Sequence, residues 1–163
     1  KRGELIMNRA KNILDQILKV VSVILFIAMV LLTTYQVIAR YIFKSPSSIS
    51  EVITRYAFVW LILVSATYVF GQRDHIAITF LRDKFSGIAR KGVDIAIECV
   101  IILFSATIML YGGFTVTQMN MLQYDSMLNI PTGFVYCMIP ICGVLTILYS
   151  IYNIILEIRS KEE

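Results

Sequence analysis

The residues of this chain that are suited to polar chemistry are concentrated in one stretch, Arg40 to His75 (RYIFKSPSSISEVITRYAFVWLILVSATYVFGQRDH). Glu51 and Arg55 are four residues apart with the acid first, which favours an ion pair on one face of a helix. Arg40 ends the preceding apolar run, so we expect it at the same level as this pair. The pattern is open to two interpretations: a network of Arg40, Glu51 and Arg55, or a solvated Glu51 beside an Arg55 that reaches toward the membrane surface.

The other ionisable candidates are isolated. Asp125 is the only charged residue between the third and fourth apolar runs, and His75 is the only histidine. The three cysteines fall in apolar sequence and have no metal-site or disulfide spacing, so we interpret them as small hydrophobic residues. The chain also has no Gly-rich phosphate loop and no nucleophile motif. We therefore expect neither enzymatic activity nor a cofactor.

The elements that hold these residues must be membrane helices. The chain has 163 residues, of which 58% are hydrophobic and 16% charged, and its mean hydropathy is +0.75. Ordinary soluble domains carry about a quarter charged residues. The uncharged sequence falls into four long blocks, each close to the ~20 apolar residues that cross a bilayer as a helix. These blocks are 20–39, 56–72, 99–124 and 126–156.

The blocks predict an all-α integral membrane protein with a single domain, residues 1–163, of four transmembrane helices. A Ser/Pro turn around Pro46, a capping pattern that begins at Ser48 and a break at Ser86-Gly87 set the boundaries. An amphipathic lead-in precedes the first helix. Helix 3 is long enough to require a tilt, a projection or a break at Gly112-Gly113, and Pro140 should kink helix 4. The predicted segments are helix 1 at about 17–43, helix 2 at about 49–72, a short interfacial amphipathic segment at about 76–85, helix 3 at about 88–124 and helix 4 at about 132–157.

The basic residues orient the helices. Five Lys and Arg residues precede the first block, three lie between the first and second, five between the second and third, none between the third and fourth, and two follow the fourth. The positive-inside rule therefore predicts that both termini are cytoplasmic. Because these residues are scattered along membrane edges rather than gathered on one face, we expect no nucleic-acid partner.

Several short motifs follow one another in a characteristic order along the chain. They are Arg40-Tyr41-Ile42-Phe43, Pro46, Ser50-Glu51, Arg55, Trp60, His75, Asp125-Ser126, Ile130-Pro131, Tyr136 and Ile139-Pro140. Their order resembles one family, the small membrane subunit (DctQ-like or Q subunit) of tripartite ATP-independent periplasmic (TRAP) transporters. A departure from the family pattern is Val52, which replaces the second Glu of a Ser-Glu-Glu motif and leaves Glu51 as the only candidate carboxylate there.

The resemblance implies a partner subunit of the bacterial inner membrane. It implies a large, elevator-type M subunit that this chain would scaffold, and a periplasmic binding protein that delivers an organic acid, such as sialic acid or a C4-dicarboxylate, for sodium-coupled uptake. The structural or partner-interface candidates are Arg40, Glu51, Arg55, Trp60, His75, Asp125, Pro131 and Pro140.

Two other functions remain open from the residues alone. One is a haem- or quinone-associated membrane anchor of a respiratory enzyme, with His75 as a ligand. The other is a free-standing small channel or exporter, for which Thr33, Gln36, Thr115, Gln118 and Asn120 are the available pore-lining material. Both are disfavoured by the lack of ionisable residues in the middle of the apolar blocks.

Overall fold

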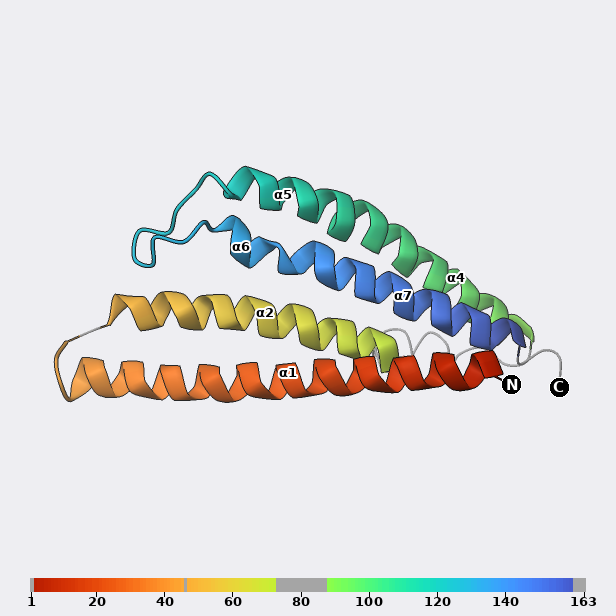
Figure 1. Ribbon diagram of the computed structural model, residues 1–163, viewed down its shortest axis with the longest axis horizontal. Helices are drawn as coiled ribbons and strands as arrows, with labels where there is room; N and C mark the ends of the chain where they lie inside the picture. The colour runs from red at the N-terminus through yellow and green to blue at the C-terminus, as the bar shows by residue number, and fades with distance from the viewer. Residues whose placement is uncertain (1, 46, 73–87, 160–163) are drawn as a thin grey trace.

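The computed structural model describes residues 2–45, 47–72 and 88–159. His75, Pro46 and the predicted interfacial segment 76–85 lie outside these ranges. The helices are, in chain order, α1 (Arg2–Tyr41), α2 (Ser48–Gln72), α4 (Ile88–Phe104), the π-helix η1 (Ser105–Gly112), α5 (Gly113–Asn120), α6 (Gly133–Tyr136) and α7 (Met138–Arg159) (Figure 1).

Four helical segments are long and apolar enough to cross a membrane. The prediction of an all-α integral membrane protein with four transmembrane helices is thereby confirmed, whereas the orientation of the termini stays a prediction. The spans, each with the mean hydropathy of its 18-residue apolar window, are Asn8–Tyr41 (2.5), Ser48–Gln72 (1.6), Gly92–Asn120 (2.3) and Gly133–Ile158 (2.1).

The spans form two antiparallel pairs (Figure 1). α1 packs along α2, and α7 packs against α2, α4 and η1. The α1–α2 and α5–α6 connections lie at one end of the molecule, which we call the turn end. The first turn of α1 and the last turn of α7 lie at the opposite end, which we call the terminal end. The sequence places the polar candidates of helices 1 and 2 at the turn end.

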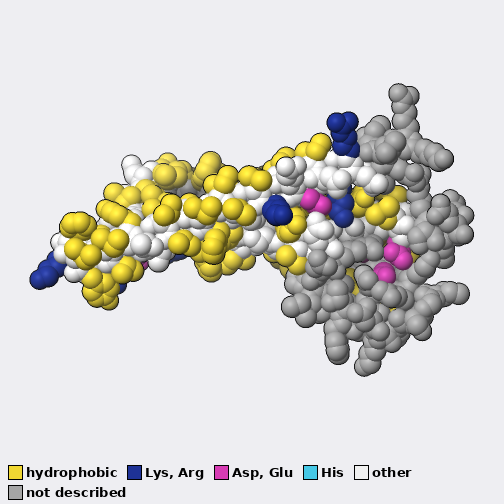
Figure 2. Space-filling model, turned by 90° about the horizontal axis from the view of Figure 1, so that it is seen from below, with side chains coloured by type: hydrophobic (Ala, Val, Ile, Leu, Met, Phe, Trp, Pro, Cys, Tyr) yellow, Lys and Arg dark blue, Asp and Glu magenta, His cyan; other side chains and the backbone are white. Residues whose placement is uncertain are grey.

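The interior is small, as expected for a chain whose outer surface is solvated by lipid. Its hydrophobic centre consists of Leu18, Val64, Cys142 and Tyr149, which come from α1, α2 and α7. Large hydrophobic residues instead cover the outside, and Figure 2 shows them along the face that carries α1. In the α1 span, 6% of the most apolar window is buried, compared with 33% in the last span. α1 therefore offers the most hydrophobic surface to lipid or to a partner.

Glycines allow the helices to approach closely. A Cβ added at Gly71 would lie 2.7 Å from the Tyr149 ring, and one added at Gly143 would lie 2.8 Å from Met109. Small residues at such crossings are the usual means of packing membrane helices, because van der Waals contact replaces the hydrophobic effect there. These two glycines fix α7 against α2 and against η1.

The third and fourth spans are irregular where Gly and Pro occur. η1 ends at Gly112 and α5 begins at Gly113, so the change of helical geometry falls on the Gly-Gly pair. In the last span the helix is interrupted at Cys137, between α6 and α7. Pro140, the third residue of α7, has no N–H to donate to the carbonyl one turn earlier, which explains an interruption just before it.

Candidate functional site

The charged candidates of helices 1 and 2 meet at the turn end. Arg55 donates from Nη2 to Glu51 Oε1 at 3.2 Å, one helical turn apart on α2. The two side chains are 67% and 62% exposed, respectively. Exposed pairs with this spacing contribute only about 0.3–0.5 kcal/mol to stability. The Glu51–Arg55 pair therefore sets the position of two charges at the membrane surface more than it stabilises the fold.

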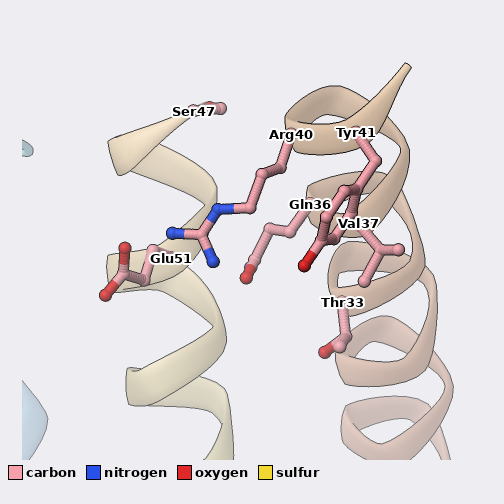
Figure 3. A pocket seen from close by; sticks show the side chains of 7 residues that line it. All are labelled: Thr33, Gln36, Val37, Arg40, Tyr41, Ser47 and Glu51. Carbon is pink, nitrogen blue, oxygen red and sulfur yellow. The ribbon is translucent and has the colours of Figure 1, made fainter. Parts of the chain in front are cut away.

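Arg40 approaches the same place from α1. Its guanidinium extends from the last turn of α1 toward α2, on the side of Glu51 (Figure 3). Arg40 and Glu51 line a cavity of about 410 Å³ together with Thr33, Gln36, Val37, Tyr41 and Ser47. The structure thus brings Glu51 and Arg55 into contact and places Arg40 across an open cavity from Glu51. In the described part of the chain, Glu51–Arg55 is the only ion pair at this end.

Gln36 ties α1 to α2 below this cavity. Its Nε2 donates to the Ser50 carbonyl at 2.9 Å and to Thr54 Oγ1 at 2.6 Å. Ser50 is 5% exposed and in turn donates from Oγ to the Ser47 carbonyl. Thr33, Gln36 and Arg40 therefore all line the cavity, and Gln36 in addition joins α1 to α2.

Asp125 organises the α5–α6 connection. Its Oδ2 accepts the Tyr56 hydroxyl at 2.7 Å, and its Oδ1 accepts the backbone N–H groups of Met127 and Leu128 at 2.9 and 3.2 Å. The Tyr56 hydroxyl first, and then these two N–H groups, hold the pKa of Asp125 below its ordinary value of 3.8, because each bond favours the ionised form. The carboxylate therefore joins the loop to α2 while it remains charged.

A second, smaller cavity lies beside Asp125. It has a volume of about 250 Å³ and is lined by Arg55, Tyr56, Val59, Asp125, Thr132, Val135 and Tyr136. Arg55 thus lines one cavity, its ion-pair partner Glu51 lines the other, and the two cavities flank the first turns of α2. Together they present two arginines and two carboxylates of alternating sign at the turn end, a pattern suited to recognising a charged protein surface.

Three further candidates serve contacts within the chain. Trp60 Nε1 donates to the Val135 carbonyl at 3.1 Å, and its ring lies 6.2 Å from that of Phe134. Pro131 pairs with Tyr124 in an isolated β-bridge, and its carbonyl accepts the Phe134 N–H at the start of α6. Trp60 and Pro131 therefore fix the position of α6, and Pro140 the start of α7. His75 lies outside the described residues.

A polar cluster at the terminal end was not predicted from the sequence. Asp15 of α1 accepts hydrogen bonds from the Tyr149 hydroxyl and, at 2.9 Å, from Gln72 Nε2. Glu98, 6% exposed, accepts from Asn153 Nδ2 at 2.9 Å. The Glu98–Asn153 contact has a signal in the sequence, because both polar residues interrupt apolar helices near the same membrane edge. Nothing in the sequence pairs Asp15 with Tyr149.

The charged residues at the turn end and the polar cluster at the terminal end are suited to charge recognition and hydrogen bonding. Among the described residues, no group of three or more His, Cys, Asp and Glu side chains is placed to hold a metal ion. The cavity of about 410 Å³ opens at the turn end and is lined mostly by polar and charged side chains. We therefore take the turn end as the candidate site, and its chemistry as contact with another macromolecule.

The comparisons with known proteins all indicate the same family. The family model "Tripartite ATP-independent periplasmic transporters, DctQ component" matches residues 29–160. A TRAP transporter small permease protein of Haemophilus influenzae is 24% identical over 139 residues, which cover 85% of this chain and 86% of that protein. The sialic acid TRAP transporter small permease protein SiaQ of Vibrio cholerae is 26% identical over 147 residues, which cover 88% of this chain and 84% of that protein.

Proposed function

The chain belongs to the DctQ component family of TRAP transporters, and we propose that it is the static scaffold subunit of such a transporter. In this proposal it pairs with a large membrane subunit that binds substrate and sodium and moves as an elevator. The observation that carries the proposal is the family match, which runs from the first span to the last. It is a multi-pass membrane protein of the transporter-permease class, whose members are not enzymes.

The internal contacts support a static role. α2 is tied to α1 by Gln36, to the α5–α6 loop by Tyr56 and to α6 by Trp60. Helices that slide past one another are expected to share few specific contacts. Here the hydrogen bonds, together with the close helix packing at Gly71 and Gly143, hold the helices in a fixed register. The hydrophobic face of α1 remains for lipid and for the larger subunit.

The turn end is proposed to face the periplasm, with both termini in the cytoplasm, on the basis of the positive-inside rule. Arg40, Glu51 and the region around Asp125 then form part of the surface on which a periplasmic binding protein docks. Alternating charges suit such an encounter, because they orient the partner and accelerate association without requiring high affinity. His75 is proposed to lie at the cytoplasmic edge of the second span.

The transported substrate is proposed to be an organic acid of the sialic acid or C4-dicarboxylate type. The support comes from the family and from one relative, whose name specifies sialic acid. Sodium coupling and substrate binding are assigned to the large subunit.

Co-purification tests the proposal. A tagged version of this chain, expressed with the large-subunit gene from the same genome, should isolate that protein from solubilised membranes in a fixed ratio. The purified chain should show no Soret absorption. Isolation of the chain alone, or a Soret band from a bound haem, would contradict the scaffold assignment.

A further inference from the structure

A groove lies between α1 and α7 at the terminal end, far from the charged cluster of the turn end. Its volume is about 280 Å³, and it is lined by Ala10, Lys11, Leu14, Leu148, Tyr149 and Tyr152. The lining is mainly apolar, and its polar side chains are Lys11 and the two tyrosines. We propose that this groove binds an anionic phospholipid, with the phosphate on the Lys11 ammonium group and one acyl chain against Leu14 and Leu148.

Lys11 is positioned for such a headgroup. Its Nζ lies 5.2 Å from the centroid of the Tyr152 ring, which restricts the side chain without neutralising it. The Tyr152 hydroxyl donates to Asn8 Oδ1 at 2.6 Å, so the ring itself is held against α1. Among the described side chains, no carboxylate forms an ion pair with Lys11.

The nearest acid on the same helix, Asp15, is already engaged. One of its oxygens accepts the Tyr149 hydroxyl and the other accepts Gln72 Nε2. Tyr149, which forms part of the groove wall, therefore directs Asp15 toward α2 and α7. This arrangement leaves the cation of Lys11 to an external anion.

The position of the groove in the membrane indicates that the anion is the headgroup of a lipid. The groove lies at the terminal edge of the first and last spans, where headgroups meet acyl chains and where tyrosine and lysine side chains are commonly found. Arg9 is exposed on the same helix and adds positive charge nearby. Basic pockets between transmembrane helices at this level bind anionic headgroups.

The size of the groove limits what it accommodates. Pockets that enclose a whole drug-sized ligand measure roughly 300–1,000 Å³, so about 280 Å³ fits one segment of an acyl chain. Leu148 is 54% exposed, so the remaining chain can continue along the outer surface of α7. A free phosphate ion would use Lys11 but not the apolar wall. This inference goes beyond the scaffold role and does not depend on it.

The proposal is tested by native mass spectrometry of the purified full chain, with its large subunit where they co-purify. After delipidation, dioleoyl phosphatidylglycerol and dioleoyl phosphatidylcholine are titrated separately. We expect phosphatidylglycerol to bind more tightly. Lys11→Gln should weaken this binding about fivefold, since a basic residue near an anionic surface contributes ~1 kcal/mol. Lys19→Gln removes the same charge from an exposed site outside the groove and should leave that binding within twofold of wild type.

Two more variants separate the parts of the site. Lys11→Arg should retain phosphatidylglycerol binding, and Leu148→Trp should reduce binding of both lipids by filling the groove. Equal binding of the two lipids, or equal effects of Lys11→Gln and Lys19→Gln, would overturn the proposal. Competition by glycerol phosphate as effective as by phosphatidylglycerol would also overturn it, because the apolar wall would then contribute nothing.

Discussion

The Tyr56 hydroxyl donates to the Asp125 carboxylate at 2.7 Å, across 69 residues of sequence. This contact joins the second span to the connection between the third and fourth, and it positions Arg55 and Asp125 around one cavity. The turn end is thus built by long-range polar contacts on a frame of membrane helices.

Removal of the Tyr56 hydroxyl should loosen the turn end without unfolding the spans. Tyr56→Phe and Asp125→Asn should each lower the thermal midpoint in detergent, and the double variant should lose less than the sum of the two, because both changes delete the same bond. The midpoints can be followed by size-exclusion chromatography of a fluorescent fusion after heating. Additive losses would show that the two residues act independently.

The charge state of Asp125 predicts a pH dependence. The pKa of Asp125 is lowered in the folded chain, so the unfolded chain binds the proton more readily, with an ordinary pKa of 3.8. The stabilisation is therefore fully present above that value and is lost as the pH falls below it. The difference in thermal midpoint between wild type and Asp125→Asn should be constant from about pH 5 to 7 and shrink toward pH 3. A difference that grows on acidification would contradict the assignment.

Close packing at Gly71 should make that position intolerant of a side chain. A Cβ there would lie 2.7 Å from the buried Tyr149 ring, whereas a Cβ at Gly92 has no neighbour within 4 Å. Gly71→Ala should destabilise the chain by roughly 1–3 kcal/mol, the usual cost of overpacking. Gly92→Ala is the matched control and should be neutral or stabilising by up to about 1 kcal/mol, since alanine favours helix. Gly71→Ala should therefore lower the thermal midpoint, whereas Gly92→Ala should leave it unchanged or raise it. Equal losses in the two variants would contradict the close packing at Gly71.

Glu51 should matter for transport more than for folding. Glu51→Gln removes an exposed ion pair with Arg55, so we expect a stability loss below about 1 kcal/mol. It also removes a carboxylate from the larger cavity, which Arg40 lines from the other helix (Figure 3). We predict that the variant inserts normally into the membrane. In vesicles that contain this chain, the large subunit and the periplasmic binding protein, uptake of the organic acid should fall severalfold.

Arg55→Gln is the control for this experiment, because it deletes the same ion pair from the other side. If Glu51 acts through the cavity that it shares with Arg40, Glu51→Gln should reduce uptake more than Arg55→Gln does. Equal effects would assign the role to the ion pair itself. Wild-type uptake in both variants would exclude a role for Glu51 and Arg55 in transport.

The architecture could be predicted from the sequence because each spanning helix is determined by one continuous run of residues. Four uncharged blocks of bilayer length determine four spanning helices, and the charge between them predicts the orientation. Gly112-Gly113, where a break was one of three alternatives for the third helix, coincides with the end of η1, and Pro140 follows the interruption at Cys137. Each of these features depends on residues that are neighbours along the chain.

The contacts between helices were not accessible in the same way. Trp60 with Val135, Tyr56 with Asp125 and Asp15 with Tyr149 each join residues that are remote in the sequence. Their pairing depends on the rotation and depth of each helix, which hydropathy does not specify. The expected turn-end network shows the same limit: Glu51 and Arg55, one turn apart, are in contact, whereas Arg40 on the other helix only lines a cavity together with Glu51.

The central claim is that this chain is a partner subunit without transport activity of its own. Reconstituted uptake of radiolabelled sialic acid or C4-dicarboxylate into sodium-gradient vesicles tests this claim most directly. We predict uptake when the chain, its large subunit and the binding protein are all present, and none from vesicles that contain this chain alone. Uptake by the chain alone, or unchanged uptake when the chain is left out, would contradict the account.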